Sequence, residues 1–332
     1  MPKSWSYVPP ADGLRTEHAR TAVLNAPEPD GLEFTVRTPV RDLTSLVVSD
    51  GVRQRLDTAI HLVKYHDVLF NQWDLKSIDP HRQGIALNLY GPPGTGKTLA
   101  AEALAAHLGH DFIDISYAEI ESRYVGETPK NIVRCFEAAR RHDAVLVFNE
   151  ADSILGSRLS SVTQSADHSV NVSRAVMLAQ LDEFTGIVVF TSNFPKNYDT
   201  AFVRRILAHV RFDLPDQPTR RRLWAVLLPK RLPLAADVNL DLLAEASDGL
   251  AGGDLVNVIL AAATKAVDRP VDDYSVHLVD LLDEITELRN VKQEVGRPQA
   301  AGPVAVWNTV AAEDARSDIT RSGEDPARIE CQ

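Results

Sequence analysis

Apolar-rich runs alternate with helical patterns along the middle of this chain. Four of them have the length of a strand: 85–90, 111–115, 144–148 and 186–190. Between two of the runs, Ile132, Phe136 and Ala139 recur at helical spacing within 128–141. Continuous apolar strands that alternate with helices are typical of a parallel sheet covered on both faces. The pattern therefore predicts an α/β fold.

The pattern changes three times along the chain. The first 44 residues hold six prolines and little periodicity. From about residue 216 onward only helical patterns occur, at 219–228, 240–247, 253–267 and 276–291. From Gly296 the chain is rich in Ala, Pro, Gly, Asp and Glu. We therefore predict an N-terminal arm or linker (1–44), a large α/β subdomain (45–215), a small all-helical subdomain (216–295) and a disordered tail (296–332).

Composition narrows the class of protein. The chain has 332 residues, 44% of them apolar, a net charge of −11, and two cysteines, Cys135 and Cys331. So few cysteines suit a reducing compartment, and no run of eighteen apolar residues or secretory signal pattern occurs. We expect a soluble, cytoplasmic protein with no membrane partner. The acidic balance also makes nucleic acid a poor default partner.

A glycine-rich motif follows the first of the apolar runs. Residues 91–98 read Gly-Pro-Pro-Gly-Thr-Gly-Lys-Thr and satisfy G-x-x-x-x-G-K-[ST]. In this motif, backbone N–H groups cradle phosphates, the lysine reaches the β- and γ-phosphates, and the final hydroxyl ligates Mg²⁺. The sequence therefore predicts that the protein binds ATP and Mg²⁺. The residues expected to hold the nucleotide are Pro93, Gly94, Thr95, Gly96, Lys97, Thr98 and Leu99.

Polar residues follow two later strands. Asn149 and Glu150 end the run at 144–148, and Asn193 follows the run at 186–190. In most P-loop ATPases the first of these positions is Asp, which holds Mg²⁺, and Glu polarises the attacking water. We expect Glu150 to be the general base, Asn149 to hold Mg²⁺ through a water without adding charge, and Asn193 to orient the γ-phosphate or the water. Asp152 is the nearest candidate for another group that could supply the missing charge.

Taken together, these motifs resemble the AAA branch of the AAA+ ATPases, in its stand-alone single-ring bacterial form, over roughly residues 45–290. The motif at 91–98 looks like its Walker A, and 146–152 like its Walker B with an Asp-to-Asn change at Asn149. Asn193 is similar to sensor 1, and Gly252 and Gly253 lie in a segment similar to the sensor 2 region. The resemblance implies an α/β ATPase domain with a helical lid, assembled into a homo-hexameric ring.

Two further assignments come from this resemblance. The segment 199–206 is similar to the one that carries arginine fingers, so Arg204 and Arg205 are expected to act on ATP bound by a neighbouring subunit. Tyr124 and Val125 lie in a Gly-containing loop that in the family faces a central pore and grips polypeptide. Leu181 to Phe184 resembles a segment used for signalling between subunits, with Glu183 where Gly is usual.

These features favour an ATP-hydrolysing ring that remodels, unfolds or disassembles protein substrates, reached directly or through an adaptor. Two alternatives stay open at the level of sequence. One is a nucleotide-gated assembly switch in which Asn149 slows hydrolysis. The other is a motor that works on nucleic acid, against which stand the acidic balance and the Tyr124 loop.

Overall fold

The computed structural model describes residues 34–79, 83–121, 127–156, 165–193, 198–270 and 274–295. The chain divides into two units, residues 1–288 and 289–332. Of the second unit only residues 289–295, at the end of a helix, are among those described. The sheet, the helices around it and the candidate site therefore all lie in the first unit.

A six-stranded sheet forms the centre of the first unit. Its strands are β1 (Val36–Arg37), β2 (Ile85–Tyr90), β3 (Phe112–Ser116), β4 (Val145–Asn149), β5 (Ile187–Ser192) and β6 (Ala208–Arg211). They lie in the order β1-β3-β4-β5-β2-β6, and all neighbours are parallel except β1, which is antiparallel to β3. β5 therefore separates β2, which leads into the glycine-rich loop, from β4, which ends at Asn149.

The central strands are buried on both faces. All six residues of β5 are buried, as are the first four of β4. Such strands need a helical layer on each side, because neither face can be left to water. One apolar cluster includes Phe136, Phe148 and Phe190, and a second, built from other strand residues, includes Leu56 and Leu104. The two clusters are the cores on the two faces of the sheet.

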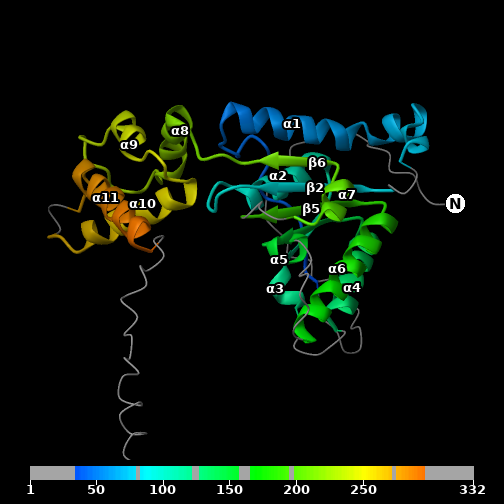
Figure 1. Ribbon diagram of the computed structural model, residues 1–332. Coiled ribbons are helices and arrows are strands. Elements are labelled where there is room, and N and C mark those ends of the chain that lie inside the picture. Colours follow the sequence, from blue (N-terminus) through cyan, green and yellow to red (C-terminus); the bar gives the residue numbers. More distant parts are fainter. Residues whose placement is uncertain are drawn as a thin grey trace, which may run out of the picture. The chain divides into compact units, whose positions relative to one another are not determined.

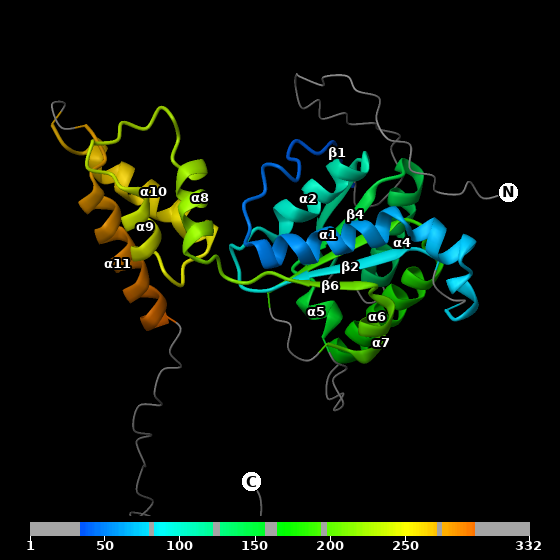
Figure 2. The same cartoon turned by 90° about the horizontal axis from the view of Figure 1, so that it is seen from above.

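Helices cover these two faces. In chain order they are α1 (Asp50–Lys64), α2 (Lys97–Leu108), α3 (Tyr117–Ile120), α4 (Glu127–His142), α5 (Asp152–Leu155), α6 (Ser165–Glu183) and α7 (Thr200–Arg205). A π-helical turn, η1 (Val68–Gln72), and a 3-10 turn, η2 (Leu75–Ser77), follow α1. Residues of α1 and α2 build one core, and residues of α4 and α6 build the other. Figure 1 shows the two layers on opposite sides of the strands, and in Figure 2 α1 runs alongside β2 and β6.

The chain continues as helices after β6. They are α8 (Gln217–Leu227), α9 (Leu240–Ala246), α10 (Gly252–Val267) and α11 (Leu278–Val295). This part has an apolar cluster of its own around Trp224, whose side chain is fully buried and whose Nε1 donates to Ser247 Oγ at 3.1 Å. Among the described residues, no helix is long and apolar enough to span a membrane.

The α/β class predicted from the apolar runs is confirmed, and each of the four runs is a strand to within two residues at either end. Two elements did not stand out from the sequence. β6 is a four-residue edge strand, Ala-His-Val-Arg, too short and too polar for a periodic signal. The second is α6 (Ser165–Glu183), which lies where the sequence analysis predicted no helix. The predicted division at residues 44, 215 and 295 stays a prediction.

Candidate functional site

The glycine-rich loop joins β2 to α2 in a conformation that requires glycine. Gly91 has φ of 145°, and a Cβ there would lie 2.0 Å from the carbonyl oxygen of Phe212. Gly96, with φ of 93°, immediately precedes the first residue of α2. Side chains rarely adopt such angles, so glycine lets the loop turn tightly onto the helix. The first N–H groups of α2 are thereby available to bind an anion.

A cavity of about 680 Å³ opens at this loop. The predicted nucleotide-binding residues all line it: Pro93, Gly94, Thr95, Gly96, Lys97, Thr98, Leu99, Gly252 and Gly253. Asn149, Glu150 and Asn193 line it as well. Its volume lies within the range of small-molecule and cofactor sites. The fold therefore gathers residues that are 160 positions apart in the chain around one hollow.

The glycine-rich loop also touches the start of α10. The backbone N–H of Gly253 donates to the carbonyl oxygen of Gly94 at 3.0 Å. A Cβ at Gly94 would lie 3.3 Å from the Cβ of Ala251 and 3.4 Å from the Cα of Gly253, so the two backbones meet closely. Gly252 and Gly253 thus reach the cavity from the helical part of the chain, at an N-terminal helix end that suits a negative charge.

Lys97 is held inside the loop. Its Nζ donates to the carbonyl oxygens of Gly91 at 2.9 Å and Pro92 at 2.8 Å, and only 7% of the residue is exposed. Burial lowers the pKa of Lys97 to about 8, while the nearby charge of Asp152 opposes that change. At neutral pH the ammonium is therefore charged and poorly solvated, which favours exchange of the loop carbonyls for phosphate oxygens.

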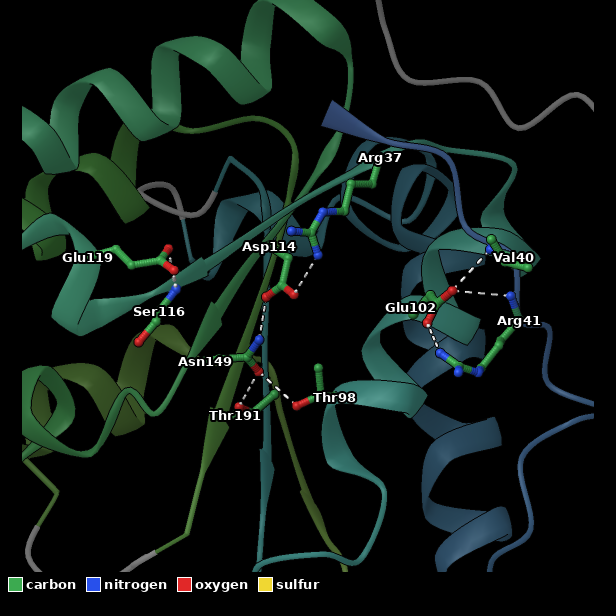
Figure 3. Close-up of polar contacts among 10 residues, drawn as sticks. All are labelled: Arg37, Val40, Arg41, Thr98, Glu102, Asp114, Ser116, Glu119, Asn149 and Thr191. Carbon is green, nitrogen blue, oxygen red and sulfur yellow. Dashed lines mark hydrogen bonds and ion pairs between the residues drawn. The ribbon is translucent and has the colours of Figure 1, made fainter. Parts of the chain in front are cut away.

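Asn149 lies at the centre of a polar cluster (Figure 3). Its Oδ1 accepts hydrogen bonds from Thr98 Oγ1 at 3.0 Å and from Thr191 Oγ1 at 2.7 Å. Its Nδ2 donates to Asp114 Oδ1. The carboxylate of Asp114 fixes which end of the amide is which, because a carboxylate can only accept, whereas a hydroxyl can donate or accept. The amide oxygen is thereby turned toward Thr98, the predicted Mg²⁺ ligand.

Asp114 is a residue that the sequence reasoning missed. It lies on β3, next to β4 in the sheet, and its Oδ2 is 3.5 Å from Arg37 on β1. Burial raises the pKa of Asp114, and Arg37 and the bond from Asn149 work against that rise. The available signal was an acidic residue in the middle of an apolar strand, Phe-Ile-Asp-Ile-Ser. Its meaning depended on knowing that β3 and β4 are neighbours.

Glu150 follows β4 in a strained turn. Its φ is 53°, in the left-handed region, which costs a residue with a Cβ about 1–2 kcal/mol. The side chain is exposed and lines the cavity. Strain of this kind is often retained where it positions a functional group. The geometry suits the general-base role expected of Glu150, which stays a prediction.

Asp152 connects the same turn to the end of β5. Its Oδ1 accepts from Ser192 Oγ at 2.6 Å, and its Oδ2 accepts from the backbone N–H of Asn193 at 3.1 Å. Both carboxylate oxygens thus bind β5 and its end. The expectation that Asp152 supplies the charge missing at Asn149 stays a prediction. Asn193 itself lies between the glycine-rich loop and Glu150, because β5 lies between β2 and β4.

Arg204 and Arg205 lie away from the cavity, at the end of α7. Arg205 makes two parallel hydrogen bonds to Asp182 of α6, and Arg204 is exposed. Both arginines line a smaller hollow together with Asp79 and Leu181. Within one chain they do not complete the site. Tyr124 and Val125, the expected pore loop, lie outside the described residues.

The side chains of the site could supply some of the ligands of a Mg²⁺ ion, but not a complete set. Among the residues that the structure describes, no group of three or more His, Cys, Asp or Glu side chains could hold a metal ion. Thr98 Oγ1 and Asn149 Oδ1 do converge, and oxygen ligands are those that Mg²⁺ prefers. In proteins Mg²⁺ is commonly held by few side chains together with nucleotide phosphates and waters. The donor set fits an ion bound in that way.

Residues 87–214 match the family model described as "ATPase family associated with various cellular activities (AAA)". The matched segment runs from β2 to just beyond β6, and so contains the loop, Asn149, Glu150, Asn193 and both arginines.

Curated relatives match over a longer part of the chain. The Cell division cycle protein 48 homolog of Archaeoglobus fulgidus is 30% identical over 300 residues, which is 83% of this chain and 40% of that protein. The Proteasome-activating nucleotidase of Methanothermobacter thermautotrophicus is 33% identical over 222 residues, 64% of this chain and 53% of that protein. Katanin p60 ATPase-containing subunit A1 of Strongylocentrotus purpuratus is 34% identical over 195 residues, which is 55% of this chain and 37% of that protein. The chain therefore spans about half or less of each of these relatives.

Among solved structures, the AAA domain of FIGL-1 has a similar fold. The TM-score is 0.62 with 23% sequence identity, over 76% of this chain and 85% of that domain. This likeness supports the fold alone.

Proposed function

We propose that this chain, whose residues 87–214 match the AAA ATPase family model, works as a subunit of an ATP-driven ring that remodels or unfolds protein substrates. The observation that carries the proposal is the division of the site. The cavity gathers the glycine-rich loop, Glu150 and Asn193, whereas the two arginines expected at the γ-phosphate lie elsewhere on the same chain.

Within one subunit, each cavity residue has a definite task. Lys97 exchanges its two carbonyl partners for β- and γ-phosphate oxygens, and the N–H groups of the loop bind the remaining charge. Glu150 accepts a proton from the attacking water, and Asn193 holds that water or the γ-phosphate in line. Thr98 and Asn149 would hold Mg²⁺, which supplies charge neutralisation on the phosphates when bound.

A second subunit completes the site. Charge builds up on the transferred phosphoryl group in the transition state, and an arginine finger that meets it is worth about 10³–10⁵ in rate. Because Arg204 is exposed at the end of α7 and absent from its own cavity, it is suited to act on a neighbour's nucleotide. A closed ring of identical subunits, a hexamer in this family, gives every site such a neighbour.

A protein substrate agrees both with the net charge of the chain and with the names of its relatives. The net charge of −11 opposes binding to a polyanion. One of the relatives is named for activating the proteasome. We extend protein remodelling to this chain, with threading through a central pore lined by Tyr124 and Val125, in the cytoplasm. Selection of the substrate falls to an adaptor or to residues outside the ATPase domain.

The ring is tested by mixing two inactive variants. Glu150→Gln lacks the base, and an Arg204→Ala/Arg205→Ala double variant lacks the fingers. In a mixed ring, some sites combine an intact Glu150 with an intact arginine from the neighbour, so mixing should restore ATP turnover. The rate per subunit of the unaltered protein should also rise from nanomolar to micromolar concentration. A rate independent of concentration, with no restoration on mixing, overturns the ring proposal.

One observation favours a second candidate, a nucleotide-gated switch with slow hydrolysis. At the position where P-loop ATPases usually carry Asp, this chain has the neutral amide of Asn149. The two candidates differ in the rate of ATP hydrolysis expected at protein concentrations high enough for full assembly. ATP-dependent unfolding of a fluorescent protein that carries an unstructured peptide tail, measured as loss of fluorescence, supports remodelling. Tight ATP binding that drives assembly without phosphate release supports the switch.

A further inference from the structure

The charge at the metal-binding edge of the site has an unexpected source. The position after β4 carries an amide, Asn149, yet the structure places a carboxylate directly behind it, Asp114 of β3. Figure 3 shows Asp114 on one side of the amide and Thr98 and Thr191 on the other. We propose that Asp114 is a positioning residue that orients Asn149 and lends its negative charge to the Mg²⁺ site, so that the Asp114–Asn149 pair does the work of a single carboxylate. This inference rests on the proposed function, because it presupposes that Mg²⁺ is held beside Thr98.

Orientation is the first part of this role. An amide can turn either end toward Thr98, and only the oxygen end can meet a hydroxyl donor and a metal-bound water together. The carboxylate of Asp114 accepts from Nδ2 and has no proton to donate to Oδ1. Thr98 and Thr191 bind Oδ1 from the other side at 3.0 and 2.7 Å. Asp114 therefore selects the arrangement that presents oxygen to the cavity.

Charge is the second part. A hydrogen bond from the amide to a carboxylate polarises the amide and makes its oxygen a stronger acceptor. The amide and carboxylate together carry one negative charge, the same as an aspartate at position 149. Arg37 approaches the other carboxylate oxygen at 3.5 Å, but its side chain is 55% exposed, so solvent screens this ion pair. Most of the charge of Asp114 thus remains available to the site.

The proposal makes the two positions interdependent. In Asn149→Asp, a second carboxylate would face Asp114 across the distance of the present hydrogen bond, and two such groups resist ionising together. In Asp114→Asn, the site loses its charge and the orienting acceptor. Exchanging both residues, in an Asp114→Asn/Asn149→Asp variant, recreates one carboxylate and one amide in contact. The double variant should therefore be closer to the original protein than either single variant.

The test measures metal binding directly. Each variant is saturated with ADP, titrated with Mn²⁺ and followed by electron paramagnetic resonance, with a thermal melt recorded in parallel. Loss of an outer partner of a metal ligand typically costs about tenfold or more in metal affinity, so Asp114→Asn should bind Mn²⁺ about tenfold more weakly. Asn149→Asp should melt earlier than the original protein, and the double variant should recover both affinity and melting temperature. Asp111→Asn, an exposed residue just before β3, removes the same charge and should change neither.

The outcomes separate this inference from the function on which it rests. If the original protein does not bind Mn²⁺ with ADP, the proposed metal site fails and the inference fails with it. If the original protein binds Mn²⁺ and a folded Asp114→Asn binds it equally well, the inference alone is overturned. Should Asp114→Asn not fold, the double variant decides. A folded double variant with affinity within about threefold of the original supports the pair, and one as weak as tenfold below it refutes the pair.

Discussion

Arg205 and Asp182 form a two-pronged ion pair within one chain. Arg205 Nε and Nη2 each donate to a carboxylate oxygen of Asp182 at 2.8 Å, and Nη1 donates to the carbonyl oxygen of Ala201 at 3.2 Å. This pair raises the pKa of Arg205 further. Its neighbour Arg204 is exposed. From the sequence, the same finger role was expected of both arginines. In the structure Arg205 is bound to Asp182, and Arg204 is exposed.

The first prediction follows from that difference. Arg204→Ala should lower ATP turnover by about 10³-fold or more, because Arg204 is exposed at the end of α7 and can extend to another subunit. Arg205→Ala should lower the melting temperature, and Asp182→Ala should reproduce that loss, because each breaks the same pair. Turnover and thermal melts of the three variants check this. Unimpaired turnover in Arg204→Ala rings would show that Arg204 is not the finger.

The second prediction separates binding from hydrolysis. Glu150→Gln should keep ATP affinity and lose about 10²–10⁴ in turnover, since it removes only the proton acceptor. Lys97→Ala should lose affinity itself, because the phosphates lose their buried cation. Binding of a fluorescent ATP analogue and phosphate release measure the two effects. Equal loss of affinity in both variants would place Glu150 among the binding groups instead.

The third prediction concerns Tyr124, which lies outside the described residues and whose role rests on the sequence. Tyr124→Ala should leave basal ATP hydrolysis intact and abolish its stimulation by protein substrate, because the aromatic side chain of Tyr124 supplies the contact with an extended polypeptide. Tyr124→Phe is the matched control and should retain stimulation. A core tyrosine behaves differently, since its removal costs about 3–5 kcal/mol of stability. A stable Ala variant that still processes substrate contradicts the pore-loop assignment.

The fourth prediction is a pH dependence of stability at His209. This residue of β6 is paired with Asn88 of β2, whose Nδ2 lies 3.3 Å from His209 Nδ1. Burial lowers the pKa of His209 below its ordinary 6.5, and the carbonyl of Val203 opposes the shift. The unfolded chain therefore takes up the proton first as the pH falls, so this residue stabilises the fold less as the pH drops below about 6.5.

Urea unfolding at pH 7 and pH 5 measures this contribution. One proton changes the free energy of unfolding by at most about 1.4 kcal/mol per pH unit. The free energy of unfolding should therefore fall less steeply between pH 7 and pH 5 in His209→Gln, by up to that amount per pH unit. His142→Gln, at an exposed position in the last turn of α4, is the control. An acid-side slope in His209→Gln equal to that of the control would rule out His209 as its source.

The sequence determined by itself whatever depends on short-range pattern. Apolar runs predicted β4 and β5 because a strand buried on both faces has few polar positions. The motif from Gly91 to Thr98 predicted the phosphate loop, and its three glycines have the positive φ angles that other residues rarely adopt. The tertiary structure decided which distant residues meet. The hydrogen bond of Asp114 to Asn149 and the pairing of Arg205 with Asp182 depend on strand order and helix packing. Such contacts leave no periodic trace, since each joins two single positions through space rather than along the chain.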